Sequence, residues 1–153
     1  MVLLFLNGDT FATGAARYDY RPATEGEVTN RIILQVDIAG ILIEAVVDTG
    51  APYVVLAPRI ARIIGLSPAS AIGRERMLIR GMRLDGNIYR FSMKLVAELG
   101  EDEELEATIF VPDSEEYWGN FPSFIGLGGF LERVRFAVDP STDMFYFGSL
   151  ALS

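Results

Sequence analysis

The tetrapeptide Asp48-Thr49-Gly50-Ala51 follows the apolar residues 45–47 and constrains this chain more than any other feature. A carboxylate that ends a buried strand is costly to bury unless it is hydrogen-bonded or serves chemistry. Thr49 supplies a hydroxyl, and Gly50 permits unusual backbone angles and leaves room for a ligand or a second chain. The segment predicts a tight turn that presents either a reactive carboxylate or a simple Asx turn, in which Asp48 accepts from the N–H two residues on.

The chain contains no His and no Cys. Their absence excludes Ser-His-Asp and Cys-His catalysis, zinc sites built on these residues, and disulfides. An enzyme with this composition would act through Asp or Glu, through Lys, or through a bound hard metal. We expect no cofactor and no metal, and the sequence carries no sign of an oxidising compartment.

The 153 residues suit one domain spanning 1–153, in which residues 1–30 are less regular and form an arm or strand. Half of the residues are hydrophobic and the mean hydropathy is +0.29, which fits extra burial at an oligomer interface. The net charge of −8 argues against nucleic acid and anionic membranes as partners. No apolar run is long enough to span a membrane, and residues 2–6 are too short for a signal peptide. The expected location is the cytoplasm.

Runs of β-branched and alternating residues predict a mostly β chain. Strands are expected at residues 2–6, 31–37, 41–47, 53–56, 77–80, 87–96, 105–111, 135–138 and 144–147. Short helices are expected from Pro58 to a stop at Gly65 and over 130–133. Turns or loops are expected at 39–40, around Gly81 and Gly86, and at 112–122, 125–129 and 139–142.

Three other segments are only weakly suggestive of ligand loops. Residues 98–106 are acidic but lack the ligand spacing and central Gly of an EF-hand, so a solvated turn is the better interpretation. Residues 139–143 lack a glycine and a closing Glu, which favours a hairpin turn. The glycine-rich segment 126–129 does not open a βαβ unit and is a poor phosphate cradle.

The order of three features resembles the retropepsin-like aspartic proteases. These features are Val46-Val47 before the Asp-Thr-Gly-Ala turn, a glycine-bearing hairpin, and Ile125-Gly126 before a short helix. Residues 124–136 (FIGLGGFLERVRF) are similar to the run that closes the domain in bacterial and cellular members. The match spans roughly residues 31–148. It implies a mostly β, single-lobe retropepsin-like fold, a closed β-barrel or sheet with one or two short helices, assembled as a C2 homodimer.

The resemblance also implies an aspartic endopeptidase, in which a water activated between two Asp48 carboxylates hydrolyses a peptide bond. Two carboxylates about 3 Å apart share one proton, because both cannot ionise at that distance. The chain has one Asp-Thr-Gly and thus half a site, so a C2 partner would supply the second Asp48. By the same resemblance, Thr49 bonds across the two-fold axis and Gly50 allows the close approach. The hydrophobic ends of the sequence, residues 2–6 and 145–152, are available for the interface.

In this family a hairpin called the flap folds over the bound peptide, and it is expected here at residues 79–87. The substrate-binding residues would then be Ala51 and, at the flap tip, Arg80, Gly81 and Met82. Arg83 and Asp85 make this tip more charged than a retroviral flap. The arginines are equally well interpreted as solvated strand ends.

Two other functions stay open. One is a non-catalytic retropepsin-like domain that dimerises or binds peptides, and the other is an unrelated β-barrel binding module in which Asp48 only makes a turn. A dimer that brings two Asp48 side chains together separates the catalytic reading from the non-catalytic one. A monomer with a pocket remote from Asp48 favours the third reading.

Overall fold

The computed structural model describes residues 1–151, and these residues form a mostly β structure, as predicted. The strands are β1 Leu4–Leu6, β2 Asp9–Ala12, β3 Gly14–Arg17, β4 Asp19–Arg21, β5 Arg31–Ile38, β6 Ile41–Asp48, β7 Val54–Val55, β8 Gly73–Ile79, β9 Met82–Leu95, β10 Leu99–Gly100, β11 Glu103–Pro112, β12 Ser123–Gly126, β13 Val134–Asp139 and β14 Met144–Ser149. The helices are α1 Pro58–Ile63 and the 3-10 turns η1 Pro68–Ser70 and η2 Leu131–Arg133.

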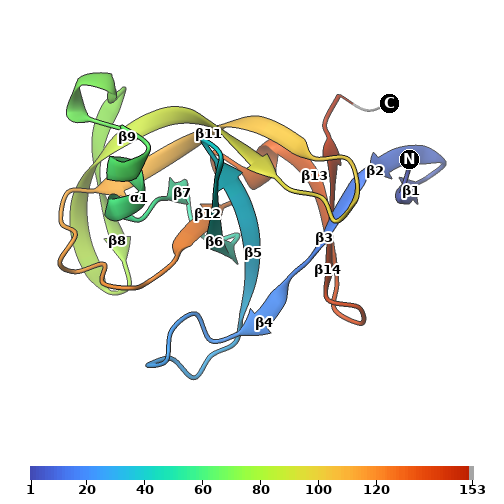
Figure 1. Ribbon diagram of the computed structural model, residues 1–153, viewed down its shortest axis with the longest axis horizontal. Coiled ribbons are helices and arrows are strands. Elements are labelled where there is room, and N and C mark those ends of the chain that lie inside the picture. The colour runs from blue at the N-terminus through green and yellow to red at the C-terminus, as the bar shows by residue number, and fades with distance from the viewer. Residues whose placement is uncertain (152–153) are drawn as a thin grey trace.

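The strands form one large sheet and two small ones. The large sheet has the order β4-β5-β6-β12-β7-β11-β9-β8, and an additional pairing of β5 with β9 curls it back on itself. A four-stranded sheet has the order β10-β3-β14-β13, and β1 pairs with β2. In Figure 1 the β8–β9 hairpin lies at one end of the molecule, while the four-stranded sheet and the β1–β2 hairpin lie at the other. The strand β6, which carries Asp48, runs between them.

Two apolar clusters make up the core. The larger one packs β5, β6, β9 and β11 against β12, η2 and β14, and includes the fully buried Ile125 and Phe145. The second cluster joins Val46 of β6 to the β8–β9 hairpin and to the aromatic residues Trp118, Phe121 and Phe124. The strand that ends at Asp48 therefore contributes side chains to both clusters, and the core fixes its position.

The turn of the β8–β9 hairpin differs from the prediction. Only Arg80 and Gly81 form it, with φ of 52° and 78°, and Ile79 pairs with Met82. Gly86 lies inside β9, where a Cβ would come within 3.0 Å of the Phe110 ring and the Val111 carbonyl. Gly86 is thus a packing residue and not a turn residue, and the hairpin that contains the range 79–87 extends over β8 and β9.

Residues 4–21 are more regular than expected, because they supply β1 to β4. The strand β3 pairs with β14 and β10, and β4 pairs with β5. The residues of β3 are Gly, Ala, Ala and Arg, which have little intrinsic preference for strands. Their strand conformation comes from pairing with β14 and β10 inside the four-stranded sheet, a tertiary effect that local sequence patterns do not report.

The remaining elements lie close to their predicted positions. The helix α1 begins at Pro58, and Gly65 follows it with φ of +83°. The strand expected at 53–56 is reduced to β7, while Ile125 and Gly126 belong to β12 and not to a turn. The acidic segment 98–106 contributes β10 and the start of β11. Within residues 1–151, no helix has the length and apolar character needed to cross a membrane.

Candidate active site

Asp48 lies at the end of the central strand β6. The parallel strand β12 runs beside it, with Ile125 opposite Val47 and Gly126 opposite Asp48. Val46 and Ile125 are fully buried, whereas Asp48 is only partly buried. The two strands therefore bring the carboxylate from the core to the surface on a rigid support.

The Asx turn that the sequence left open is present. The N–H of Gly50 donates to Oδ1 of Asp48 over 3.0 Å, and the N–H of Ala51 donates to the Asp48 carbonyl over 3.0 Å. Within residues 1–151, no group forms a hydrogen bond or ion pair with Oδ2. The turn orients the carboxylate and leaves one of its oxygens available, so an Asx turn and a chemical role are compatible.

Gly50 serves this turn differently from our expectation. Its φ lies outside the left-handed region, so unusual backbone angles are not the reason for a glycine here. A Cβ at this position would lie 3.2 Å from Oδ1 of Asp48, which is a crowded contact. The missing side chain keeps the surroundings of the carboxylate open.

Two further glycines, Gly126 in β12 and Gly128 in the turn after β12, allow the loop that follows Asp48 to pack closely against them. A Cβ at Gly126 would come within 3.0 Å of the carbonyl oxygens of Ala51 and Tyr53, and one at Gly128 would meet the Pro52 carbonyl equally closely. Real Cβ atoms are not found at such distances from backbone, so residues 51–53 can take this path only over glycines. The Ile125-Gly126 element noted in the sequence is thus a packing requirement of the Asp48 loop.

A cavity of about 210 Å³ lies in front of Asp48. Its lining includes Asp48, Gly50, Ala51 and Arg80 of the predicted site residues, together with Arg31 and Phe124. The other predicted site residues, Thr49, Gly81 and Met82, do not line the cavity, and Thr49 is exposed. Residues 77–79 of β8 also line the cavity, which places the hairpin beside the carboxylate. The sequence did not identify Arg31, Phe124 or β8 as parts of the site. Of these, only Phe124 could have been found, because it directly precedes Ile125-Gly126.

Surface contacts tie the β8–β9 hairpin to the rest of the site. The hydroxyl of Tyr53, in the Asp48 loop, donates to Oε1 of Glu75 on β8 over 2.6 Å. This hydrogen bond, with a further contribution from burial, raises the pKa of Tyr53. Arg74 forms an ion pair with Asp113 at 2.6 Å. The base of the hairpin is therefore linked both to the Asp48 loop and to the segment after β11.

Three aromatic residues support the hairpin tip. Trp118 makes edge contacts with Phe121 and Phe124 at centroid distances of 6.1 and 6.0 Å, and the two phenylalanines stack at 5.1 Å. The guanidinium carbon of Arg80 lies 3.9 Å from the centre of the Phe121 ring, and its Nη1 donates to the Trp118 carbonyl over 3.5 Å. This aromatic cluster connects the cavity wall at Phe124 to the tip of the hairpin.

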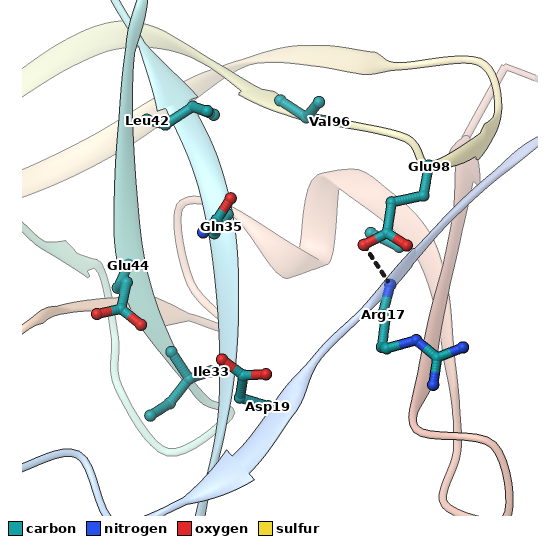
Figure 2. Close-up of a pocket in the computed structure, with 9 residues that line it drawn as sticks. Arg17, Asp19, Ile33, Gln35, Leu42, Glu44, Val96 and Glu98 are labelled. Atoms are coloured by element: carbon teal, nitrogen blue, oxygen red, sulfur yellow. Dashed lines mark hydrogen bonds between the residues drawn. The ribbon is translucent and has the colours of Figure 1, made fainter.

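A second cavity, of about 240 Å³, shares no lining residue with the first. Figure 2 shows its polar groups, among them Glu98, whose carboxylate accepts a hydrogen bond from the backbone N–H of Arg17. Arg21 pairs with Glu44 and, at 3.6 Å, with Asp19. Each of these three acids has one oxygen paired within the chain, as Asp48 has, but none of them follows a buried strand into a glycine turn.

Comparison with known proteins identifies the fold. No protein-family model and no curated protein sequence matches the chain. Among solved structures, it is similar to a retropepsin-like aspartic protease from Rickettsia conorii, with a TM-score of 0.55, 17% identity and coverage of 87% of this chain and 98% of that one. It is also similar to the retroviral protease-like domain of Ddi1 from Leishmania major, with a TM-score of 0.50, 20% identity and coverage of 81% and 96%. The chain therefore has the fold of the retropepsin-like aspartic proteases.

Proposed function

We propose that this protein is an aspartic endopeptidase that acts as a C2 homodimer with one Asp48 from each copy. One carboxylate activates a water molecule for attack on the peptide carbonyl, and the other, protonated, donates to the carbonyl oxygen. The observation that carries the proposal is the partly buried Asp48, whose Oδ1 is fixed by Gly50 and whose Oδ2 faces no partner within residues 1–151. The retropepsin-like fold supports the same chemistry.

A second copy is part of the proposal because each chain has a single Asp-Thr-Gly. Thr49 is exposed and free to bond across the two-fold axis. Exposed apolar side chains at the β1–β2 hairpin and near β14 are available for an interface, among them Phe5 at 66%, Leu6 at 53% and Leu150 at 54% exposure. Leu152, which the sequence also suggested for this interface, lies outside the described residues.

The proposed pair of acids makes cleavage depend on pH. The competent form holds one proton between two carboxylates, because ionising both places like charges side by side. Cleavage of a short peptide is therefore expected to be fastest in acid and to fall towards neutrality. A rate that is flat or rising from about pH 5 to about pH 8 would contradict a carboxylate pair.

The direct test compares wild type with Asp48→Asn in a peptide-library cleavage assay. The amide has the same shape but cannot share a proton, so cleavage should fall by at least about a hundredfold while the circular dichroism spectrum is unchanged. Asp37→Asn is a matched control, because Asp37 also accepts from a turn glycine, Gly40, over 3.1 Å but lies outside the cavity. Cleavage by Asp48→Asn at close to the wild-type rate would refute the proposal.

Mixing experiments test whether the site is shared between copies. When excess Asp48→Asn protein exchanges subunits with wild type, mixed dimers hold only one acid, so activity should drop below the value expected from dilution. Activity that follows simple dilution would mean that one chain has a complete site. Sedimentation measurements on the same samples establish whether dimers are present.

A peptide-binding domain without catalysis is the second candidate. The observation in its favour is the Asx turn, which gives Asp48 a structural role without any reaction. In that case peptides would bind to wild type and to Asp48→Asn equally well, and neither protein would cleave them.

A further inference from the structure

The cavity in front of Asp48 has an unusual charge for this chain. The protein carries 21 acidic residues against 13 basic ones, yet two arginines, Arg31 and Arg80, line this single cavity beside one acid, Asp48. The other lining side chains are mainly apolar, including Val55, Met77, Ile79 and Phe124. A cationic cavity on a protein with a net charge of −8 is a local feature that needs its own explanation.

Among residues 1–151, no carboxylate neutralises the charge of Arg80. Arg21, Arg62, Arg74, Arg76 and Arg90 each lie within 4.0 Å of a carboxylate. Arg80 instead lies over the Phe121 ring and donates to the Trp118 carbonyl, and within residues 1–151 no carboxylate pairs with it. An aromatic face and a carbonyl orient the guanidinium, and its positive charge stays available to a ligand.

The backbone of Arg80 supports this interpretation. Its φ of 52° lies in the left-handed region, where two-residue hairpin turns favour Asn, Asp or Gly. A long side chain at such a position is uncommon, and residues in unfavourable backbone conformations cluster at functional sites. The backbone conformation of this turn does not favour an arginine, so the contacts of the side chain account for its place here: it anchors the tip on Phe121 and holds a guanidinium at the cavity rim.

Arg31 adds a second, partly buried cation. Its only ion pair is with Glu27, at a long 3.9 Å, and its Nε is buried without a hydrogen-bond partner in the described part of the chain. Asp48 lines the cavity, Glu27 pairs with the Arg31 that lines it, and Glu75 on β8 bonds Tyr53 of the Asp48 loop. Arg31 is placed to share an incoming acceptor with Arg80, because both side chains line the same 210 Å³ cavity.

We propose that this cavity selects peptides with a Glu or Asp side chain, which Arg80 binds with support from Arg31. The guanidinium is suited to this task because its planar fork matches a carboxylate. The apolar lining receives the methylene groups of the acidic residue. This inference rests on the proposed peptide-cleaving function and names the substrate class of that site.

The test uses paired fluorescent peptides that carry Glu or its uncharged analogue Gln at one position at a time. At one position, Glu should raise kcat/KM about threefold to tenfold over Gln, because a charge-assisted hydrogen bond is partly offset by the exposure of Arg80. The preference should disappear below about pH 4, where the peptide carboxylate is protonated. The uncharged peptide reports any pH effect of Asp48 and Glu27 themselves.

The variants separate selectivity from a structural role of Arg80. Arg80→Gln should remove the Glu preference, and Arg80→Lys should restore part of it. Arg83→Gln, on β9 of the same hairpin but outside the cavity lining, should keep the preference. A looser hairpin would lower cleavage of both peptides alike, so the ratio of the two rates is the deciding measurement. An unchanged ratio in Arg80→Gln, or no Glu preference at any position, would overturn the inference.

A binding measurement keeps the inference testable if no peptide is cleaved. Fluorescence polarisation of the same pairs with Asp48→Asn protein should show tighter binding of the Glu peptide, again lost in the Arg80→Gln background. Selective binding without cleavage would refute the proposed catalysis and leave the selectivity standing. Equal or absent binding of both peptides would reject the selectivity, while cleavage without selectivity would reject it and leave the catalysis standing.

Discussion

The Asp48 turn and the tip of the β8–β9 hairpin line the same cavity, but different forces hold them. The turn is packed backbone to backbone on Gly126 and Gly128 and extends from strands that carry fully buried side chains such as Val46 and Ile125. The tip carries Leu78 at 71% exposure, and it contacts the body through the Arg80 side chain and through Ile79 and Leu84 in the second apolar cluster. We call the first the core wall because backbone packing fixes it, and the second the surface wall because side chains attach its tip.

This difference predicts different energetics for the two walls. Moving Asp48 requires the β6–β12 packing to change, which is coupled to global unfolding. Opening the hairpin tip leaves the β6–β12 pairing intact and requires the packing of Ile79 and Leu84 and the contacts of Arg80 to break, while the exposed ion pairs of the hairpin contribute little each. A peptide could therefore enter beneath the hairpin while the carboxylate stays in place.

The strongest test of the comparison places an extra methyl group in each wall. Gly126→Ala forces a Cβ against the backbone of residues 51–53 and should cost about 1–3 kcal/mol of unfolding free energy, because overpacked sites relax poorly. Gly73→Ala, on β8, meets no atom within 4 Å and should change stability little. Urea denaturation gives both values. Equal effects of the two substitutions would remove the distinction between a core wall and a surface wall.

The core wall was largely predictable from the sequence. Residues 41–51 combine an apolar run with a turn motif, and Ile125-Gly126 adds a second apolar run that ends in glycine. Both patterns arise from burial, which local sequence reports well, and the structure brings the two segments together as neighbouring parallel strands. Parallel pairing of strands so far apart follows from the fold and not from any local pattern.

The surface wall was predictable only in outline. The hairpin was expected, but Gly81 and Gly86 look alike in the sequence, and only the position of Phe110 against Gly86 distinguishes a packing glycine from a turn glycine. Arg31 gave no signal, because its place in the cavity depends on how β5 lies relative to the hairpin. Surface contacts between distant segments depend on tertiary structure, so sequence reasoning did not find them.

A milder test removes the link between the two walls. Tyr53→Phe deletes the hydroxyl that donates to Glu75, so amide exchange in β8 should accelerate while the urea midpoint changes little. The pKa of Tyr53 is raised, so the link is present below the usual tyrosine pKa of about 10 and is lost as the pH rises through the higher folded value. Tyr20→Phe, at a 60% exposed site on β4, is the control. Slower or unchanged exchange in β8 would show that Tyr53 does not restrain the hairpin.

The smallest expected effect concerns the ion pair across the hairpin itself, between Arg76 of β8 and Asp85 of β9 at 2.8 Å. The hydrogen bond from Arg76 lowers the pKa of Asp85, and Arg74 contributes to the same shift. A lowered folded pKa means that the pair stabilises the hairpin above the usual aspartate pKa of about 3.9 and stops doing so as the pH falls through the lower folded value.

Because both side chains are at least half exposed, global stability should not change measurably when the pair is removed. Asp85→Asn should speed amide exchange in β8 and β9 at pH 6, and its difference from wild type should shrink as the pH falls below about 3.9 and through the lower folded value, where wild type loses the pair as well. Asp9→Asn makes the same charge change on β2 and should leave the hairpin unaffected. If Asp85→Asn instead lowers the urea midpoint of the whole protein, the hairpin is part of the cooperative core and the contrast between the two walls fails.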